Sequence, residues 1–456
     1  MINVWHCWVV RPQAAFFAAQ FGLLAVLALW RFPTDSVAGW MEGNRGVLLV
    51  LAACQASFYL NNLDNLVVDR NFNLFLTKTV KALAGGLAVA WALFLLFPRL
   101  APGYPAGLSA ALLSAMVLLS IRPLMGWLVR RRKMVEGVLI VGTGELARKL
   151  HRELVSAGTP VKIRGFLTDQ PGFASSGVAE GQAIHYSELR DLILKHRVSR
   201  IVVADPNPQT SEELTTALVD CKLRGLEIEQ AVDSYEKMGG KIWLEALRPE
   251  WLIYSDGFRQ SKYYLRLKSF MDLAGAAALI LLTAPVLALA AAAIKLDTRG
   301  PVLFRQVRVG KHGRRFVLYK FRSMREDAEQ HCGPTWAREG DSRVTRVGRV
   351  LRKYRLDELP QAFNILRGEM SLVGPRPERP YFVNLLSQRV PYYDLRHYVK
   401  PGATGWAQVR YPYGASIEDA YEKLQYDLYY AKNMSLSLDL LVLLKTLRVV
   451  LFGRGR

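Results

Sequence analysis

Four long apolar runs dominate the first 130 residues of the chain. They cover residues 13–30, 46–63, 79–97 and 106–129. Each run is close to the about 20 residues that a helix needs to cross the hydrocarbon core of a bilayer. The pattern therefore predicts an α-helical membrane bundle of four transmembrane helices over residues 1–133. The alternative is the buried helical bundle of a soluble protein.

Basic residues near the ends of these runs are unevenly distributed. With the amino terminus inside the cell, one side of the membrane holds Arg11, Arg70, Lys78, Lys81 and the run Arg130 to Lys133, and the other holds Arg31, Arg45 and Arg99. Cytoplasmic loops of membrane proteins are enriched in Lys and Arg. We therefore expect both ends of the bundle in the cytoplasm, and we expect the amino terminus, which has no small-residue cleavage site, to be retained.

After the Arg-rich run, short apolar strands alternate with helices, as in GVLIVGTGELARKLHREL, IRGFL and RIVVAD. This alternation predicts a parallel α/β sheet, a Rossmann-like domain over residues 134–250. Gly142, Gly144 and Ala147 match the dinucleotide-binding fingerprint, whose glycines form a tight turn and bring a phosphate to a helix amino end. Asp169 follows a second strand, but it lies further along the chain than the about 20 residues at which a ribose-binding acid is expected. A nucleotide cofactor and a purely architectural domain both remain open.

A fifth apolar run extends from Leu273 to Ile294 and contains Pro285. A full crossing would separate the rest of the chain from the cytoplasmic phosphates that its later motifs suit. Proline breaks or bends a helix, and Thr283 can help to satisfy the freed backbone carbonyls. We expect a re-entrant helix over about residues 272–296 that dips into one leaflet; a plain span and a soluble core helix are the alternatives.

The net charge of +21 fits nucleic acid, anionic lipid or phosphorylated substrates. No zinc spacing, RNP-like strand or helix-turn-helix pattern accompanies the basic residues, so we expect membrane lipids and phosphates as partners, and no nucleic acid. The four cysteines are scattered and predict neither a disulfide framework, a redox motif nor a metal site.

Residues 305–325 contain eight Lys or Arg and no acid. They predict two strands around a turn from Gly310 to Gly313, the second alternating through Phe316, Leu318, Lys320 and Arg322. Such a stripe can bind phosphates or lie against anionic lipid as a solvated face. The two interpretations are compatible.

Two adjacent carboxylates, Asp357 and Glu358, follow in the string LRKYRLDELPQ. The basic residues around them are Arg349, Arg352, Lys353 and Arg355. Close to Pro360, the pair is expected in the first turn of a helix, whose dipole favours anions and keeps Asp ionised. An ionised carboxylate can attack phosphorus or hold Mg²⁺. The alternative is a surface ion-pair cluster.

Three further segments extend this chemistry. Arg376 lies between prolines in GPRPE, which suits a fixed guanidinium for a phosphate. The string HYVKPGATGWAQVRYPYG carries aromatics with Thr404 and Gln408, which can hold a planar base or form an ordinary turn. The apolar tail LDLLVLLKTLRVVLFGRGR, with Lys445 and Arg448, predicts an interfacial helix.

The strings VLFRQVRVG, FRSM, RLDELPQAFNILRGEMSLVGPRPE and KPGATGWAQV together resemble the polyprenyl-phosphate phosphosugar transferases, or bacterial sugar transferases, which include undecaprenyl-phosphate glucose and galactose phosphotransferases. The resemblance covers about 262–456 and implies an α/β monotopic catalytic domain over 251–456 with a re-entrant membrane helix. The upstream layout looks like the large members. The segment YEKMGGKIWLEALRPEWLIYSDGF is similar to exosortase-associated exopolysaccharide transferases.

The resemblance implies a two-step phosphotransferase reaction on the cytoplasmic face of the bacterial inner membrane, as the first membrane step of exopolysaccharide synthesis. Asp357 would attack the β-phosphorus of a UDP-sugar, UMP would leave, and undecaprenyl phosphate would take the phosphosugar. The resemblance also implies that Asp357 and Glu358 bind Mg²⁺ and that Pro285 breaks the helix. It places Thr404 and Gln408 near the uridine. The residues implied to hold phosphates are Lys320, Arg322, Arg352 and Arg376.

Two positions depart from the family pattern: Ala284 stands where relatives usually have Ser, and Arg410 where many have Asn. Three alternatives stay open: a UDP-releasing polyprenyl-phosphate glycosyltransferase, an NAD-dependent redox enzyme or epimerase using the Gly142 turn, and a non-enzymatic membrane scaffold. No motif identifies the sugar. The chain suits a homodimer as well as a monomer.

Overall fold

The computed structural model of the chain divides into two compact units, Met1–Gly239 and Gly240–Arg456. The residues that the structure describes are 45–60, 72–101, 111–112, 114–117, 136–142, 144–156, 161–168, 183–185, 189, 193, 198–204, 212–247, 249–255, 257–258, 261–325, 341, 343–411, 414 and 416–451. The predicted first span, 13–30, lies outside them, as does most of the predicted fourth span, 106–129.

Two apolar helices, α3 (Arg45–Leu60) and α4 (Phe72–Leu96), pack against each other in the first unit. A Cβ on Gly86 would lie 2.8 Å from the Cys54 Cα atom, so only glycine permits this approach. Small residues at helix contacts are typical of membrane helices. Among the described residues, Thr77–Leu96 and Lys262–Asp297 are long and apolar enough to cross a membrane, by length and composition.

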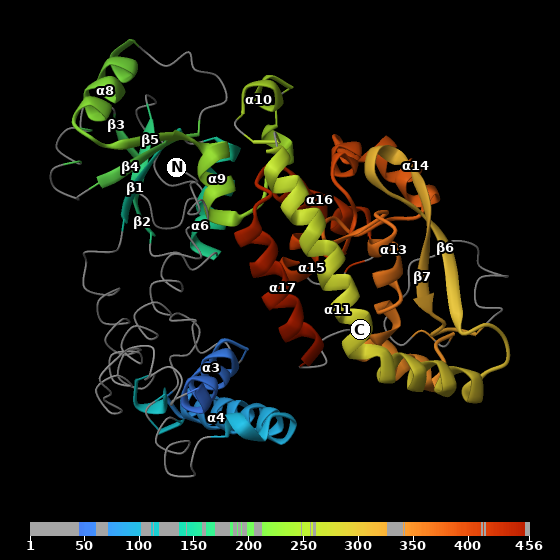
Figure 1. The fold of residues 1–456 in the computed structure, drawn as a ribbon. Helices are drawn as coiled ribbons and strands as arrows, with labels where there is room; N and C mark the ends of the chain where they lie inside the picture. Colours follow the sequence, from blue (N-terminus) through green and yellow to red (C-terminus); the bar gives the residue numbers. More distant parts are fainter. Residues whose placement is uncertain are drawn as a thin grey trace. The chain divides into compact units, whose positions relative to one another are not determined.

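A five-stranded parallel sheet forms the rest of the first unit (Figure 1), and it confirms the predicted parallel α/β sheet. The strands run in the order β3-β2-β1-β4-β5, so the order reverses beside β1. They are β1 (Glu136–Val141), β2 (Val161–Thr168), β3 (Ala183–His185), β4 (Val198–Val203) and β5 (Glu227–Gln230). The helices are α6 (Glu145–Ser156), α8 (Glu212–Leu223) and α9 (Ala231–Gly239).

The fingerprint residues lie in the turn after β1 and in the first part of α6. Gly142 follows β1 with a φ of 104° and donates its N–H to the Leu167 carbonyl at 2.8 Å. This left-handed backbone favours glycine. A Cβ on Gly144 would meet nothing within 4 Å, and Ala147 is completely buried. Asp169 lies outside the described residues, so its predicted relation to this turn stays open.

The second unit begins at Gly240, eleven residues before the predicted start of the catalytic domain at 251. Trp406 donates its indole N–H to the Gly240 carbonyl at 2.7 Å, and the Ile242 amide donates to the Gln425 carbonyl at 3.0 Å. Ile242, Leu244 and Leu247 join the main core of this unit. The segment with η3 (Leu244–Ala246) and α10 (Pro249–Tyr254) is therefore part of the second unit through its packing.

Helix α11 (Lys262–Asp297) contains Pro285 and bends part-way along its length in Figure 1. Before the proline, Ala276 packs with Phe316 and Ile365; after it, Ala290 and Ile294 pack with Phe321 and Leu351. Both halves of the bent helix thus pack against the same unit. On the outer side, Leu281, Leu282 and Leu289 are more than 70% exposed.

The contact made by Thr283 differs from the sequence expectation. Its hydroxyl donates to the Leu279 carbonyl at 2.6 Å. The carbonyl freed by Pro285 is four residues before it, at Leu281. The expectation that Thr283 satisfies that freed carbonyl is therefore wrong, because a hydroxyl on a helix reaches its own preceding turn.

The next elements of the second unit begin with a hairpin that the sequence predicted. Strands β6 (Leu303–Val309) and β7 (Arg315–Phe321) pair antiparallel through the turn η4 (Lys311–Gly313), which confirms that prediction. The following elements are α12 (Arg346–Lys353), η5 (Leu356–Glu358), α13 (Gln361–Leu366), β8 (Ser371–Val373), α14 (Pro380–Arg389), η6 (Tyr393–Tyr398), β9 (Gly402–Thr404), α15 (Trp406–Arg410), α16 (Ile417–Lys432) and α17 (Leu436–Leu451).

Helix α17 has an apolar outer side and a buried polar attachment. Leu440, Leu444 and Leu447 are exposed, as an interfacial helix requires. On the inner side, Asp439 forms a buried ion pair with Lys268 of α11 at 2.8 Å. The last helix of the unit is thus tied to the first part of the bent helix.

Candidate active site

The two adjacent carboxylates lie in the short helical turn η5, immediately before α13. Arg355, which precedes this turn, has a left-handed backbone with φ 53° and ψ 24°. A non-glycine residue in this region costs about 1–3 kcal/mol and is often found at functional sites. Asp357 is 8% exposed. The prediction of a helix start holds in part, because the pair precedes α13 rather than forming its first turn.

Glu358 gathers three cations from three different parts of the unit. Its carboxylate lies 2.6 Å from Arg376 Nη2, 3.1 Å from Lys320 Nζ of β7 and 3.6 Å from Arg355 Nη1. Burial acts to raise the pKa of Glu358, but the charges of Arg376, Lys320 and Arg355 outweigh it and hold the pKa below its usual range. Glu358 is therefore the permanently ionised member of the pair.

Asp357 has the opposite electrostatic situation. Burial first, and the neighbouring Glu358 charge second, raise the pKa of Asp357 to about 6, against the opposing charges of Lys320, Arg352 and Arg376. Its carboxylate accepts no hydrogen bond from the residues that the structure describes. Asp357 is therefore ionised above about pH 6, although burial and the like charge of Glu358 both oppose its ionisation. An unengaged carboxylate that titrates near neutral pH can act as a nucleophile.

Arg376 connects Glu358 to Gln408. Its Nη1 donates to Gln408 Oε1 at 3.1 Å while its Nη2 donates to Glu358 Oε1. The structure therefore brings together Lys320, Arg376 and Gln408 around Glu358. Arg352 acts on Asp357 through its charge.

Arg322 and Thr404 are held elsewhere by the fold. Arg322 is 6% exposed and donates to the carbonyls of Arg299 and Thr298 at 2.7 and 2.9 Å, so it satisfies acceptors at the carboxyl end of α11. The Thr404 hydroxyl pairs with the Thr446 hydroxyl of α17 at 2.6 Å. Both side chains lie outside the hydrogen bonds that surround Glu358, and both join separate elements of the unit.

The aromatic residue of the KPGATGWAQV string belongs to the core. Trp406 is 3% exposed and stacks on Tyr429 of α16 with ring centroids 6.1 Å apart. Its indole N–H is already used by Gly240. A buried, paired indole cannot serve as a stacking platform for a base, which excludes Trp406 from that role; Tyr411, from the longer string HYVKPGATGWAQVRYPYG, lines the pocket described below.

The glycines of this string allow close contact with the GPRPE loop. A Cβ on Gly402 would collide with the backbone of Gly374, and one on Gly405 with the Gly374 carbonyl. A Cβ on Gly374 would collide with the Lys400 carbonyl. The two glycine-containing motifs are therefore one packed backbone unit that carries Arg376.

We expect Gly374→Ala to lower the free energy of unfolding by about 2–3 kcal/mol, because backbone atoms must move to admit the methyl group. The midpoint of thermal unfolding in detergent measures this effect. Gly144→Ala is the control, since its Cβ would meet nothing within 4 Å. Equal stability of the two variants would contradict the proposed packing.

A pocket of about 100 Å³ adjoins the carboxylate pair through Arg355 and Arg376. Its other lining residues include Gln408, Tyr411, Lys423 and Asp427. Sequence reasoning missed Lys423 and Asp427 because they lie in no motif. Their spacing of four residues places them on one face of α16, which is the signal that could have found them.

Comparison with known proteins identifies the second unit. Residues 263–453 match the family model described as bacterial sugar transferase. Over 186 residues, the chain is 46% identical to the UDP-glucose:undecaprenyl-phosphate glucose-1-phosphate transferase of Caulobacter vibrioides, covering 39% of this chain and 67% of that protein. The chain belongs to the bacterial sugar transferase family.

Two other relatives in this family match a longer part of the chain. One is the UDP-N-acetylgalactosamine-undecaprenyl-phosphate N-acetylgalactosaminephosphotransferase of Aeromonas hydrophila, 43% identical over 56% of this chain and 59% of that protein. The other is the undecaprenyl-phosphate glucose phosphotransferase of Komagataeibacter xylinus, 33% identical over 71% of this chain and 60% of that protein. The matched part thus spans about three fifths of each of these two relatives.

The acidic residues of the site fit a metal ion that binds together with the substrate phosphates better than a metal ion held by the protein alone. Within the described part of the chain, no three His, Cys, Asp or Glu residues group closely enough to hold a metal ion. Mg²⁺ commonly binds one or two carboxylates together with substrate phosphates. The adjacent Asp357 and Glu358 supply the two carboxylates of such a donor set.

Proposed function

We propose that this bacterial sugar transferase moves a sugar-1-phosphate from a UDP-sugar to undecaprenyl phosphate and releases UMP. The observation that carries the proposal is the carboxylate pair. Asp357 is buried, unengaged and raised in pKa, next to Glu358, which gathers Lys320, Arg355 and Arg376. A nucleophile beside a cation cluster suits attack on a diphosphate. The names of the relatives agree with this chemistry.

In this proposal the reaction takes place in two displacements. An Asp357 oxygen attacks the β-phosphorus, the bond from that phosphorus to the bridging oxygen breaks, and UMP leaves with the electron pair. A phosphate oxygen of undecaprenyl phosphate then attacks the same phosphorus and displaces Asp357. The product is undecaprenyl diphosphate sugar, and the carboxylate is regenerated.

The basic side chains have separate roles in this proposal. Lys320 and Arg376 hold the transferred phosphate, and Arg352 adds positive charge beside Asp357. Arg322 contributes through the end of α11, which it holds in place. A Mg²⁺ ion held by Asp357, Glu358 and substrate phosphate oxygens would neutralise the diphosphate.

The pocket beside the pair would receive the nucleotide. Gln408 supports this role, because its buried Nε2 donates to no residue that the structure describes and can donate to a carbonyl of uracil. Lys423 and Arg355, also in the pocket wall, would face the α-phosphate. Thr404 acts indirectly, by joining β9 to α17.

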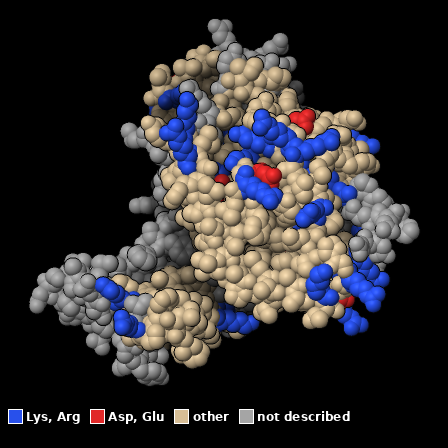
Figure 2. Space-filling view, turned by 45° about the vertical axis from the view of Figure 1, so that its right-hand side comes forward, with Lys and Arg blue, Asp and Glu red and all other residues tan. Residues whose placement is uncertain are grey.

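The proposed location is the bacterial inner membrane, with four spans and the catalytic unit on the cytoplasmic face. Both halves of α11 pack against this unit, which supports a re-entrant helix bent at Pro285. Figure 2 shows basic side chains gathered around a few acids beside a broad surface without charge, as contact with inner membrane lipids requires. The strand order and the Gly142 turn support the Rossmann-like domain expected over residues 134–250. We place the reaction at the first membrane step of exopolysaccharide synthesis, in a monomer or a homodimer.

Nucleotide release tests the proposal. The purified full chain is given several UDP-sugars in turn with Mg²⁺ and undecaprenyl phosphate, and UMP and UDP are separated. UMP with one donor supports phosphosugar transfer and identifies the sugar. UDP would indicate a glycosyltransferase that moves the sugar alone, and neither nucleotide from any donor would favour a scaffold.

The raised pKa of Asp357 predicts an acid limb in the pH profile. The nucleophile must be ionised, so activity is present above the pKa and falls as pH decreases through about 6. Because kcat/KM reports the free enzyme, it should fall about tenfold per pH unit below that value. An unperturbed carboxyl would place this limb near pH 4. A limb at pH 4 would contradict the assignment of Asp357 as the buried nucleophile.

A further inference from the structure

The GPRPE loop is held by its backbone carbonyls. Pro375 and Pro377 have no N–H, so the loop has few donors of its own. Nevertheless, each carbonyl from residue 375 to residue 378 accepts a hydrogen bond from another part of the unit. The donors, in order, are the Gly402 amide at 2.9 Å, Arg396 Nη2 at 3.1 Å, Arg308 Nη1 at 3.0 Å and the Val309 amide at 2.9 Å.

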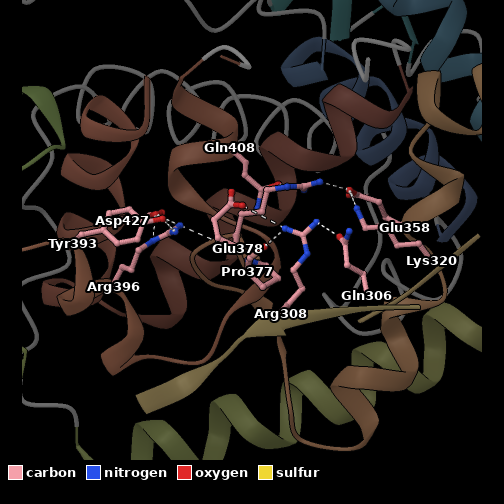
Figure 3. Close-up of polar contacts among 11 residues, drawn as sticks. Gln306, Arg308, Lys320, Glu358, Pro377, Glu378, Tyr393, Arg396, Gln408 and Asp427 are labelled. Carbon is pink, nitrogen blue, oxygen red and sulfur yellow. Dashed lines mark hydrogen bonds and ion pairs between the residues drawn. The ribbon is translucent and has the colours of Figure 1, made fainter. Parts of the chain in front are cut away.

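Arg396 is a buried cation, and each of its three guanidinium nitrogens donates a hydrogen bond. It is 7% exposed, and its Nε and Nη2 donate to Asp427 Oδ2 of α16 at 3.2 and 2.7 Å. Its Nη1 donates to the Tyr393 hydroxyl at 2.6 Å (Figure 3). A buried charge is costly unless it is paired and hydrogen-bonded, and Asp427 provides that pairing. The remaining hydrogen bond to the Arg376 carbonyl is therefore fixed in direction.

Arg308 holds the next carbonyl from the opposite side. It extends from β6 and donates to the Pro377 carbonyl, while its Nη2 donates to Gln306 on the same strand. Figure 3 shows Arg308 beside Pro377 and Glu378, and Arg396 approaching from the other side with Asp427. The backbone that carries Arg376 is thus held by hydrogen bonds from two arginines, Arg396 and Arg308.

We propose that Arg396, paired with Asp427, and Arg308 are positioning residues that aim the Arg376 guanidinium at Glu358. Neither arginine makes a hydrogen bond to the carboxylate pair among the described residues. A long Arg side chain keeps a fixed direction only when its own backbone is fixed, and the two contacts of Arg376 to Glu358 and Gln408 depend on that direction. The kinetic part of this inference rests on the proposed phosphosugar transfer.

Arg396→Lys tests the proposal with the charge beside Asp427 retained. One ammonium cannot make the four hydrogen bonds of the guanidinium, so the Arg376 carbonyl loses its donor. We expect kcat to fall about 10- to 100-fold, because small displacements in an active site have effects of this size. The contact of Arg376 Nη1 with Gln408 Oε1, 3.1 Å in the wild type, should also be lost.

Lys241→Gln is the matched control. Lys241 is a buried cation paired at 3.6 Å with Glu422, on the same helix as Asp427, and lies outside the hydrogen bonds that hold residues 375–378. It should lower the midpoint of thermal unfolding without lowering kcat. Equal falls of kcat in both variants, or an unchanged kcat in Arg396→Lys, would overturn the proposal.

A crystal structure of the Arg396→Lys variant separates this inference from the proposed function. Arg376 Nη2 should leave hydrogen-bond distance of Glu358 Oε1, from which it lies 2.6 Å in the wild type. Retention of that contact would overturn the positioning role whatever the activity. If the wild type releases no UMP from any donor, the proposed function fails, and the displaced guanidinium still decides the role of Arg396.

Discussion

Asp357→Asn should reduce UMP release by about 10³-fold or more. The side chain is nearly isosteric, but an amide is a poor nucleophile, so no phosphosugar can be transferred to the protein. Incubation with a UDP-sugar labelled on the β-phosphate, without undecaprenyl phosphate, should label the wild type and leave the variant unlabelled. The midpoint of thermal unfolding should stay at the wild-type value, because Asp357 accepts no hydrogen bond within the described part of the chain.

Asp220→Asn is the control for the chemical change. Asp220 forms an exposed ion pair with Arg224 at 2.9 Å on α8, and such pairs contribute little to stability. This variant should release UMP at the wild-type rate. UMP release by Asp357→Asn at a comparable rate would refute the covalent mechanism.

Pro285→Leu should allow α11 to straighten into a full span and carry the catalytic unit to the opposite side of the membrane. A proline inside a helix costs about 3 kcal/mol, and its replacement removes the opposition to a continuous apolar helix. We expect loss of UMP release from a donor supplied on the cytoplasmic side. A cysteine introduced by His312→Cys, in a chain without its native cysteines, should become accessible from the outside.

Ala284→Leu is the matched control for this topology experiment. It adds the same side chain at the neighbouring position, which is also exposed, and it keeps the proline. The cysteine at position 312 should then stay accessible from the cytoplasm. The same cytoplasmic labelling in Pro285→Leu would show that the bend does not depend on the proline.

Local patterns in the sequence determined several elements correctly. Period-two alternation around Gly310 predicted the β6–β7 hairpin, and apolar strands alternating with helices predicted the parallel sheet of the first unit. The adjacent Asp357 and Glu358 were recognisable because both the pair and its basic neighbours lie within one short segment. Such features need only near neighbours along the chain, and their physical causes are local.

Only the tertiary structure decided which partners each charged group has. Arg322 and Lys320 belong to one predicted stripe, yet Lys320 reaches Glu358 and Arg322 holds the end of α11. The string KPGATGWAQV suggested a base-binding loop, but its glycines Gly402 and Gly405 admit the backbone of Gly374. Contacts between residues far apart in the chain are set by packing, which no local pattern encodes.

The state of Asp357 shows the same division. Its expected place at a helix start favours the ionised form, whereas burial and the Glu358 charge raise its pKa. Arg396 and Asp427, 31 residues apart and in no motif, form the buried pair behind Arg376. The sequence determined which groups are available for phosphate chemistry, and the fold decided which are buried, which are paired and which stay free, because desolvation and geometry arise only when the chain is packed.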